Sequence, residues 1–371
     1  MCGIFGLITP RGASPRIIDL DAVLDSISHR GPDGRSTYQS PDGCYQAAFC
    51  RLSIIDLETG QQPILDDAHR NVLVGNGEIY NYRDLRNRFS DYPFKTQGDM
   101  ETVLAAAAHG GDDFIQHLNG MFALALYDGK IHQLILARDR LGIKPLYWAE
   151  LSGGGLVFAS EIKAILASGL IDAEIDEAAV CAYLAHGYVP SPNTLFAGIN
   201  KIPPAHKLTF DKNGLSLERY WQPALDLNLP SNPSDISAYL LGLLEDAVGL
   251  QLQSDVPVGA LLSGGIDSAL TAAVAVDALG PDRVHCVMMP SPYTSDESLE
   301  DAAAAAKALG CRLDNINIGP AMEAFDGMMA PSFEGLPPDT TEENIQARSR
   351  GIILMALSNK TSAMVVSTGN K

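Results

Sequence analysis

Short apolar runs occur throughout the first 160 residues and predict a strand-rich domain. These runs are rich in β-branched and aromatic residues, and Gly, Pro, Asn and Asp separate them, as is typical of strands joined by turns. We expect strands at 3–9, 45–56, 72–74, 121–127, 131–137 and 156–159. Amphipathic periodicity predicts helices between them at 17–28 and 100–109. Further strands are expected up to about Trp221.

The pattern changes after this strand-rich region. Residues 222–234 contain three prolines and show no periodicity, so we interpret them as a linker. Helical and strand-like segments then alternate, which is typical of a parallel α/β sheet. Helices are expected at 235–252, 266–279, 299–309 and 349–357, and strands at 258–262, 284–289 and 363–367. The predicted domains are 2–221 and 235–371, and we expect the second sheet to be incomplete because the sequence stops at Lys371.

Composition and charge restrict the expected partners and compartment. A formal charge of −19 argues against non-specific binding to nucleic acid or to an anionic membrane. No apolar run reaches about 18 residues and the N-terminus does not resemble a signal peptide, so no membrane span or secretion is expected. The 6 cysteines are irregularly spaced and form no Cys-x-x-Cys pair. This favours reduced thiols in the cytoplasm over a disulfide framework or a zinc site.

The cysteine at position 2 becomes the N-terminal residue when the initiator methionine is removed. Cys2 would then carry a free α-amine beside its thiol. An α-amine has a pKa of about 7.7–8.0, so it accepts protons near neutral pH and activates a nucleophile on its own residue. The simpler alternative is a small residue at a frayed terminus. The apolar residues 3–6 instead favour a terminus that is inserted in a sheet.

Three further groups suit a site near the N-terminus, and each has a simpler explanation. Arg51 in an apolar strand needs an anion, which is either a substrate carboxylate or an internal Asp or Glu. Asn76 and the Gly77 N–H are suited to stabilise an oxyanion, although Asn-Gly at 75–78 is also typical of a plain hairpin turn. Asp99 opens a predicted helix, where an N-cap is the alternative to a binding role.

Six motifs resemble the class II glutamine amidotransferase domain, in the version found in glutamine-hydrolysing asparagine synthetases. They are Cys-Gly-Ile-Phe-Gly at 2–6, His-Arg-Gly-Pro-Asp-Gly at 29–34, Arg-Leu-Ser-Ile-Ile-Asp at 51–56, Asn-Gly-Glu-Ile-Tyr-Asn at 76–81, Arg-Asp-Arg-Leu-Gly-Ile-Lys-Pro-Leu-Tyr at 138–147 and Phe-Ala-Ser-Glu-Ile-Lys-Ala at 158–164. The resemblance covers about residues 2–268. It implies an α+β N-terminal nucleophile (Ntn) hydrolase sandwich, with two sheets inside and helices outside.

The resemblance also implies the reaction at the amino terminus. Cys2 would attack the side-chain amide of glutamine, while Asn76 and Gly77 would form the oxyanion hole. The products would be glutamate and ammonia. No cofactor is expected for this half of the reaction.

The same resemblance implies how the two charged ends of glutamine are held. Arg51, with help from the Ile55 backbone, would bind the α-carboxylate. Glu78 and Asp99 would hold the α-ammonium, and Asn76 is expected to contact glutamine as well. One positive and two negative side chains suit a zwitterionic amino acid, so the chemistry agrees with the resemblance.

A glycine-rich loop, Ser-Gly-Gly-Ile-Asp-Ser at 263–268, lies between a predicted strand and a predicted helix. Its backbone amides and the helix N-terminus favour a phosphate, and Asp267 suggests an intervening Mg²⁺. A generic glycine turn is the alternative, and the loop lacks the Gly-Lys-Ser/Thr of the Walker pattern. It resembles the pyrophosphate loop of ATP pyrophosphatases. This implies that ATP contacts Leu262, Ser263, Gly264, Gly265, Asp267 and Ser268.

Over about 263–371 the chain resembles glutamine-dependent NAD synthetases instead. The motifs are Met-Met-Pro-Ser-Pro-Tyr-Thr-Ser at 288–295, Thr-Glu-Glu-Asn-Ile-Gln-Ala-Arg at 341–348 and Ser-Thr-Gly-Asn-Lys at 367–371. They imply nucleotide contacts by Arg348 and Thr368, for which a solvated helix arginine and a turn residue are the alternatives. Both families share the loop at 263–268, so we interpret the chain as a hybrid joined there. A further acidic Mg²⁺ ligand is expected just past Lys371.

Together the resemblances imply a ligase that takes its amide nitrogen from glutamine. Ammonia would react with an ATP-adenylated carboxylate to give an amide, AMP and pyrophosphate. The first two-thirds of the chain favour aspartate as the acceptor, as in asparagine synthetase, and the last third favours deamido-NAD. Two other interpretations stay open: an enzyme that only hydrolyses glutamine, and a catalytically dead hybrid fragment. No nucleic-acid or membrane partner is expected, and a homodimer is left open.

Overall fold

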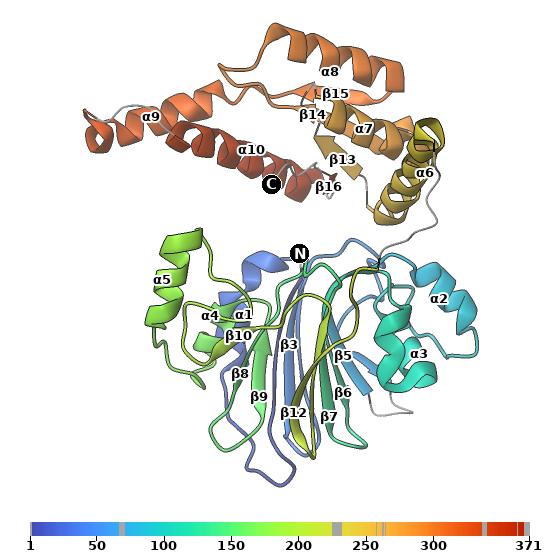
Figure 1. Ribbon diagram of the computed structural model, residues 1–371, viewed down its shortest axis with the longest axis vertical. Coiled ribbons are helices and arrows are strands. Elements are labelled where there is room, and N and C mark those ends of the chain that lie inside the picture. The colour runs from blue at the N-terminus through green and yellow to red at the C-terminus, as the bar shows by residue number, and fades with distance from the viewer. Residues whose placement is uncertain are drawn as a thin grey trace. The chain divides into compact units, whose positions relative to one another are not determined.

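The computed structural model describes residues 2–66, 71–224, 232–256, 258–261, 263, 265–335, 340–361 and 363–366. The chain forms two compact units, Met1–Asp226 and Leu227–Lys371 (Figure 1). The predicted Leu262, Gly264 and Thr368 lie outside the described residues.

Two antiparallel sheets of six strands form the centre of the first unit. The first sheet has the order β10-β8-β9-β1-β3-β2 and consists of β1 (Gly3–Ile8), β2 (Gly34–Gln39), β3 (Tyr45–Arg51), β8 (Tyr147–Glu150), β9 (Leu156–Ala159) and β10 (Ile199–Lys201). The second has the order β12-β11-β7-β6-β5-β4 and consists of β4 (Ile64–Asp66), β5 (Asn71–Ile79), β6 (Gly120–Asp128), β7 (Gln133–Arg138), β11 (His206–Asp211) and β12 (Gly214–Arg219). Strand β1 is central because it pairs with β3 and with β9.

This unit has four layers, two sheets and a layer of helices on each side, with buried apolar side chains between them. Ile4 of β1 and Val74 of β5 belong to the core between the two sheets, whereas Phe5 points to the opposite face of the first sheet. Helices α1 (Leu20–Ser26) and α4 (Ile162–Ala167) cover that outer face, and α2 (Tyr82–Arg88) and α3 (Glu101–Gly110) cover the second sheet. The predicted sandwich, with two sheets inside and helices outside, is confirmed. A further helix, α5 (Glu177–His186), follows α4 along the chain.

A parallel sheet of order β15-β14-β13-β16 forms the centre of the second unit. Its strands are β13 (Val258–Leu261), β14 (Val284–Met288), β15 (Arg312–Asn315) and β16 (Met364–Val366). Helices are α6 (Pro233–Gln251), α7 (Ile266–Leu279), α8 (Asp296–Leu309), α9 (Gly319–Phe333) and α10 (Thr340–Thr361). Cys286 of β14 packs with α7 and α8, while Val287 packs with α9 and α10. Helices therefore lie on both faces, which confirms the predicted α/β class.

Several expected boundaries and elements needed correction. The strand expected at 45–56 ends at Arg51, and the turn expected at 75–78 is absent because β5 continues to Ile79. Helices α2, α4, α5 and α9 lie in segments where none was expected.

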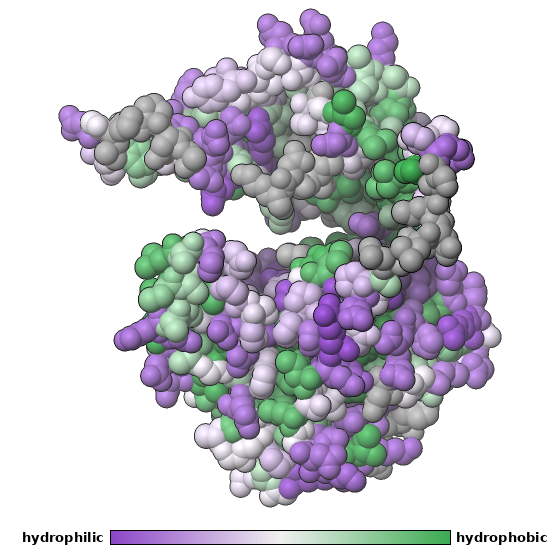
Figure 2. Space-filling view, viewed as in Figure 1, coloured by the Kyte–Doolittle hydropathy of each residue, from purple (hydrophilic) through white to green (hydrophobic). Residues whose placement is uncertain are grey.

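Apolar side chains remain exposed on some of the described helices. Tyr183 and Leu184 of α5 and Leu240 of α6 are examples, and Figure 2 shows green surface over these helices. Among the described helices, none has both the length and the apolar character needed to cross a bilayer.

Candidate active site

Cys2 lies immediately before β1, whose first residue pairs with Cys50 of β3. Its thiol is half-buried, and the Leu52 N–H donates to Sγ at 3.4 Å. Burial raises the pKa of the thiol above its ordinary value, while the Leu52 N–H and the charge of Arg51 act in the opposite direction. The thiolate is the reactive form of cysteine. A proton acceptor beside Cys2 would therefore be needed for attack near neutral pH.

Arg51 is the last residue of β3, and its guanidinium is bound by the loop that follows. Nη2 donates to the carbonyl oxygens of Ile55, at 3.3 Å, and Asp56, and Nη1 donates to that of Leu57, at 3.4 Å. Each of these acceptors is a backbone carbonyl. These hydrogen bonds are therefore not the ion pair with an internal carboxylate that was the alternative. Carbonyl oxygens leave the positive charge of Arg51 unneutralised, which keeps it available to an anion.

Asn76 and Gly77 lie within β5 rather than in a turn. They pair with Ala123 and Phe122 of β6. Gly77 has a φ of 153°, and a Cβ there would lie 2.0 Å from the Met121 carbonyl oxygen, so only glycine fits. The side-chain amide nitrogen of Asn76 is buried and has no hydrogen-bond partner among the described residues. A buried donor without a partner is costly, so this amide is available to donate to a ligand oxygen in the pocket.

Glu78 and Asp99 bring two carboxylates to the same place. Burial and the charge of Asp99 raise the pKa of Glu78 to about 7, which the charge of Lys144 opposes. Burial raises the pKa of Asp99 to about 6, although its Oδ2 accepts the Ile79 N–H at 2.7 Å. The expected alternative of an N-cap is wrong, because Met100 occupies that position of α3. Both carboxylates favour a cationic partner that would replace their lost hydration.

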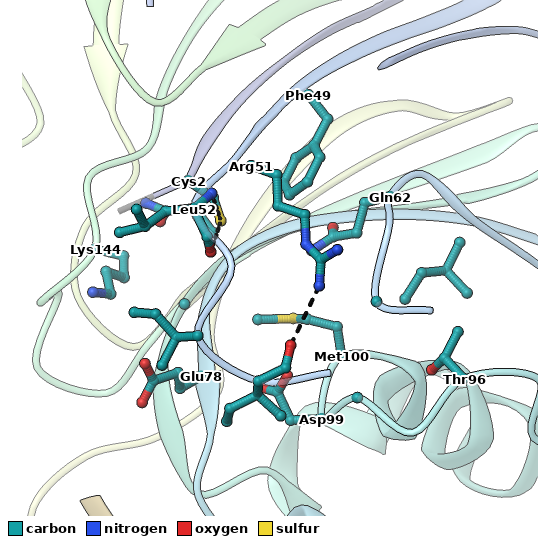
Figure 3. A pocket seen from close by; sticks show the side chains of 17 residues that line it. Cys2, Phe49, Arg51, Leu52, Gln62, Glu78, Thr96, Asp99, Met100 and Lys144 are labelled. Carbon is teal, nitrogen blue, oxygen red and sulfur yellow. Dashed lines mark hydrogen bonds between the residues drawn. The ribbon is translucent and has the colours of Figure 1, made fainter. Parts of the chain in front are cut away.

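All seven residues predicted for the amino-terminal site line one pocket (Figure 3). They are Cys2, Arg51, Ile55, Asn76, Gly77, Glu78 and Asp99. Figure 3 shows the Arg51 guanidinium between Phe49 and Asp99, with Cys2 on the opposite side from Thr96. These seven residues therefore provide one cation, two carboxylates, a thiol and an unsatisfied amide donor. This arrangement suits a zwitterion whose amide reaches the thiol.

Lys144 also lines this pocket, although no role was predicted for it from the sequence. Hydrogen bonds within its loop place Lys144 there. The Asp139 carboxylate accepts hydrogen bonds from the N–H groups of Ile143, at 2.9 Å, and Lys144, at 3.0 Å. Arg138 donates to the carbonyls of Gly142 at 2.6 Å and of Lys144 at 2.7 Å. Burial lowers the pKa of Lys144, and the charge of Glu78 opposes this shift. The motif at 138–147 contained the signal, but only the fold shows which of its charged residues reaches the pocket.

In the second unit, the described part of the 263–268 loop begins α7. The N–H of Ser263 donates to Oγ of Ser268 at 3.0 Å, and that hydroxyl donates to the Gly265 carbonyl at 3.0 Å. Ser268 is buried, whereas Ser263, Gly265 and Asp267 are exposed at the start of the helix. The strand–loop–helix context that the sequence predicted is confirmed by β13 and α7.

Arg348 lies on α10 and has a local partner. Its Nη1 donates to Oδ1 of Asn344, one turn earlier, at 2.9 Å. Among the described residues, the hydrogen bonds of Arg348 go to Asn344, and none goes to the 263–268 loop. Its predicted contact with a nucleotide stays a prediction.

The sequence predicts Mg²⁺ at Asp267, in the 263–268 loop. Among the described residues, no group of three His, Cys, Asp or Glu side chains is placed to hold a metal ion. Asp267 is a single exposed carboxylate in the first turn of α7. Mg²⁺ commonly takes one or two carboxylates and completes its shell with water and substrate phosphates. Asp267 thus fits a metal that arrives with a nucleotide.

Comparisons with known proteins match both halves of the chain. The family model of the glutamine amidotransferase domain matches residues 1–221, and that of NAD synthase matches residues 238–371. Asparagine synthetase [glutamine-hydrolyzing] 3 of Bacillus subtilis (strain 168) is 38% identical over 283 residues, which are 74% of this chain and 45% of that protein. A putative asparagine synthetase [glutamine-hydrolyzing] of Mycobacterium bovis is 36% identical over 337 residues, covering 84% of this chain and 51% of that protein.

Among solved structures, the glutamine-dependent NAD+ synthetase from Acinetobacter baumannii in complex with ADP has 39% identity. The match covers 46% of this chain and 32% of that chain, with a TM-score of 0.33. The chain spans about half the length of the curated relatives named above. The amidotransferase match covers more than half of this chain and coincides with the pocket around Cys2. The chain therefore belongs to the glutamine amidotransferase domain family.

Proposed function

We propose that the first unit hydrolyses glutamine with Cys2 as its nucleophile. The observation that carries this proposal is the buried Asn76 amide without a partner, in the same pocket as the Cys2 thiol. After removal of Met1, the α-amine of Cys2 takes the thiol proton while sulfur attacks the amide carbon. Asn76 Nδ2 and the Gly77 N–H then donate to the oxyanion. The amine returns the proton to the leaving nitrogen, which departs as ammonia, and water cleaves the thioester to release glutamate.

The charged walls of the pocket orient the substrate. Arg51 binds the α-carboxylate beside the Ile55 backbone, because its carbonyl partners leave its charge uncompensated. Glu78 and Asp99 bind the α-ammonium, which replaces the hydration that burial has removed from them. Opposite charges at the two ends fix which way glutamine lies, so that its amide faces Cys2.

The second unit is proposed to bind ATP and to activate a carboxylate by adenylation. The NAD synthase match over 238–371 and the start of α7 after β13 support this role. The phosphates would meet the N-terminus of α7, with Ser263, Gly265 and Ser268 around them, and Leu262 and Gly264 stay predicted contacts. Asp267 would hold Mg²⁺, which neutralises phosphate charge when it is bound. Arg348 and Thr368 are proposed to contact the nucleotide.

The complete reaction is proposed to be that of a glutamine-hydrolysing asparagine synthetase, with aspartate as the acceptor. The curated relatives, which carry that printed name, support this choice over their matched regions. The NAD synthase match supports deamido-NAD as a second candidate acceptor. Use of ATP and reduced cysteines favours the cytoplasm as its location.

The test follows each half-reaction in the full chain. Glutamate release from glutamine should occur in the wild type and be abolished by Cys2→Ala. With ATP, Mg²⁺ and glutamine, formation of asparagine from aspartate supports the first acceptor, whereas formation of NAD from deamido-NAD supports the second. Exchange of labelled pyrophosphate into ATP reports adenylation by itself. Glutamate release that persists in Cys2→Ala would overturn the glutaminase assignment.

A further inference from the structure

Two motifs have no role in the proposed chemistry, and they meet at the residue that carries the nucleophile. Arg30 comes from the segment 29–34 and Glu161 from the segment 158–164. Nε of Arg30 donates to the carbonyl oxygen of Cys2 at 2.9 Å, and Nη1 donates to Oε1 of Glu161 at 2.8 Å. The two donors of one guanidinium thus connect Cys2 to a residue more than 150 positions away in sequence.

The Arg30 side chain is buried, and two of its three guanidinium nitrogens, Nε and Nη1, have hydrogen-bond partners. Only 8% of the side chain is exposed. A Cβ on Gly3 would lie 3.4 Å from Cδ of Arg30, so the alkyl stem lies close against the beginning of β1. At Gly31, a Cβ would lie 2.4 Å from the Cys50 carbonyl, which requires glycine for this segment to approach β3. The local backbone therefore brings the guanidinium to the end of β1 and leaves it little freedom.

Glu161 anchors the guanidinium from the other side. Partial burial acts to raise its pKa, but hydrogen bonds from Arg30, His29 and Lys163 outweigh this and hold the pKa at about 2. Glu161 is therefore an anion near neutral pH. The neighbouring Ser160 contacts β1, because its hydroxyl accepts a hydrogen bond from the Ile4 N–H at 3.1 Å. Both contacts tie the segment 158–164 to the first three residues of the mature chain.

We propose that Arg30, held by Glu161, is a positioning residue that orients the thiol and α-amine of Cys2 toward the oxyanion donors. Cys2 precedes the first paired residue of β1, and chain termini fray unless they are tied down. A charge-assisted hydrogen bond to its carbonyl fixes the only peptide plane that the mature Cys2 has. Rotation about the Cα–C bond is then the remaining freedom of the amine and the thiol, and the Leu52 N–H, which donates to Sγ at 3.4 Å, limits that rotation. This inference rests on the proposed hydrolysis at Cys2 and adds the means by which the nucleophile is held.

The test is Arg30→Lys in the full chain, with glutamate release measured over a range of glutamine concentrations. An ammonium replaces the guanidinium charge but cannot reach the Cys2 carbonyl and Glu161 with the same fork. We expect kcat to fall by about 10–100-fold, since small misplacements of reacting groups have effects of that size. KM should change less than about threefold, because Arg51, Glu78 and Asp99 are untouched. A purely structural role would lower the amount of folded enzyme instead, which active-site titration with an electrophilic glutamine analogue measures.

The matched control is Arg35→Lys. Arg35 also pairs with a carboxylate, Asp25 at 2.6 Å, but both are exposed. This variant should keep the wild-type kcat and KM. If Arg30→Lys does not fold, Glu161→Gln serves instead, and it should lower kcat with KM preserved.

The outcomes separate the two proposals. Suppose that the wild type releases glutamate and that folded Arg30→Lys, or Glu161→Gln, has the same kcat as the wild type. This result overturns the positioning role and leaves the proposed function standing. A rise in KM at unchanged kcat overturns it too. Absence of glutamate release from the wild type overturns the proposed function, and the positioning role with it.

Discussion

Burial makes the charged forms of Glu78 and Asp99, two residues of the pocket around Cys2, unfavourable. Each carboxylate is buried, and the charge of Asp99 adds to the effect of burial on Glu78. The largest opposing influence on the pKa of Glu78 is the charge of Lys144. A substrate ammonium would supply the missing positive charge, so the repulsion between these carboxylates favours binding of an α-amino acid.

A pH dependence of glutamine use follows from these two residues. With the pKa of Glu78 at about 7, the carboxylate becomes protonated as the pH falls through neutrality. The Cys2 amine has an ordinary pKa of about 7.7–8.0 and must be neutral for catalysis. Its protonation therefore also lowers the activity as the pH falls. Above about pH 6, where Asp99 is still largely ionised, we expect the fall of kcat/KM toward acid to approach a slope of two, and a slope of one in Glu78→Gln. A slope of one in the wild type would contradict this assignment.

Stability should depend on pH through the same residue. The pKa of Glu78 in the folded protein lies above its ordinary value of 4.5, so folding favours the protonated form. Its contribution to stability is present at pH 4 and is lost as the pH rises through about 7. Glu78→Gln should therefore raise the Tm of the first unit at pH 8 relative to the wild type, and the gain should vanish near pH 4. A gain that is equal at both pH values would argue against the shifted pKa.

Removal of the unsatisfied amide tests the oxyanion hole. Loss of one such donor typically lowers kcat by about 10²–10³-fold, and we expect this for Asn76→Ala with little change in KM. The Tm should not fall by much, because Asn76 Nδ2 has no partner in the described structure to lose. Asn213→Ala, in an exposed turn, is the control and should be as active as the wild type. A KM effect without a kcat effect would place Asn76 in substrate binding only.

Residue types with a chemical purpose were predictable, whereas their partners were not. Cys2 and Arg51 stood out in the sequence because a nucleophile and a cation lay beside apolar strands, and Asp99 because it opened a predicted helix. Lys144 and Arg30 were within recognised motifs, yet their contacts depend on strands that are distant in sequence. A charged residue in a motif gives no direction for its side chain, and only the fold provides one.

At the scale of elements, β5 shows where local signals mislead. Asn-Gly favours a two-residue hairpin, but nine paired residues between β5 and β6 extend this strand through the Asn-Gly pair to Ile79. Tertiary pairing outweighed the local preference. The glycine is needed for a different reason, which is the close approach of Met121.

Gly77→Ala should therefore disturb both the strand and the site. The backbone strain at a φ of 153° is worth about 1–3 kcal/mol, and the contact with the Met121 carbonyl adds to it. We expect a lower Tm and loss of glutamate release, since the Gly77 N–H would move. Gly249→Ala is the matched control, because Gly249 lies in α6 with no atom within 4 Å of its added Cβ. That substitution should be neutral or stabilise by about 0.5–1 kcal/mol, and a comparable loss in both variants would contradict the argument.

Elements with strong periodicity were predicted well. The helix expected at 266–279 matches α7, and the strand expected at 156–159 matches β9. Helix α9 was missed because Pro331 lies inside it, and proline ordinarily ends a helix. The short helix α4 has only 6 residues, too few for a periodic signal to emerge.

At the scale of the whole molecule, the buried apolar residues fall into separate cores. Each of the five clusters described draws its members from one unit only, three from the first and two from the second. The change of sequence pattern near residue 221 indicated such a division. A strand-rich segment and a segment of alternating strands and helices form different layer architectures, each with its own core. Which acceptor the second unit uses is not encoded in any such pattern, since it depends on a few side chains around a substrate.

Separate cores predict separate unfolding transitions and ligand responses. Both tryptophans, Trp148 and Trp221, belong to the first unit, so their fluorescence follows that unit alone while calorimetry detects both. In Cys2→Ala, glutamine at about 100 times its Kd adds about 2.7 kcal/mol to the stability of the unit that binds it. For a unit of this size, that corresponds to a rise of roughly 5–10 °C in the fluorescence-detected transition. ATP with Mg²⁺ should instead shift the other calorimetric transition. A single transition that both probes report, and that either ligand shifts equally, would show that the units unfold as one and that the separation of their cores has no energetic consequence.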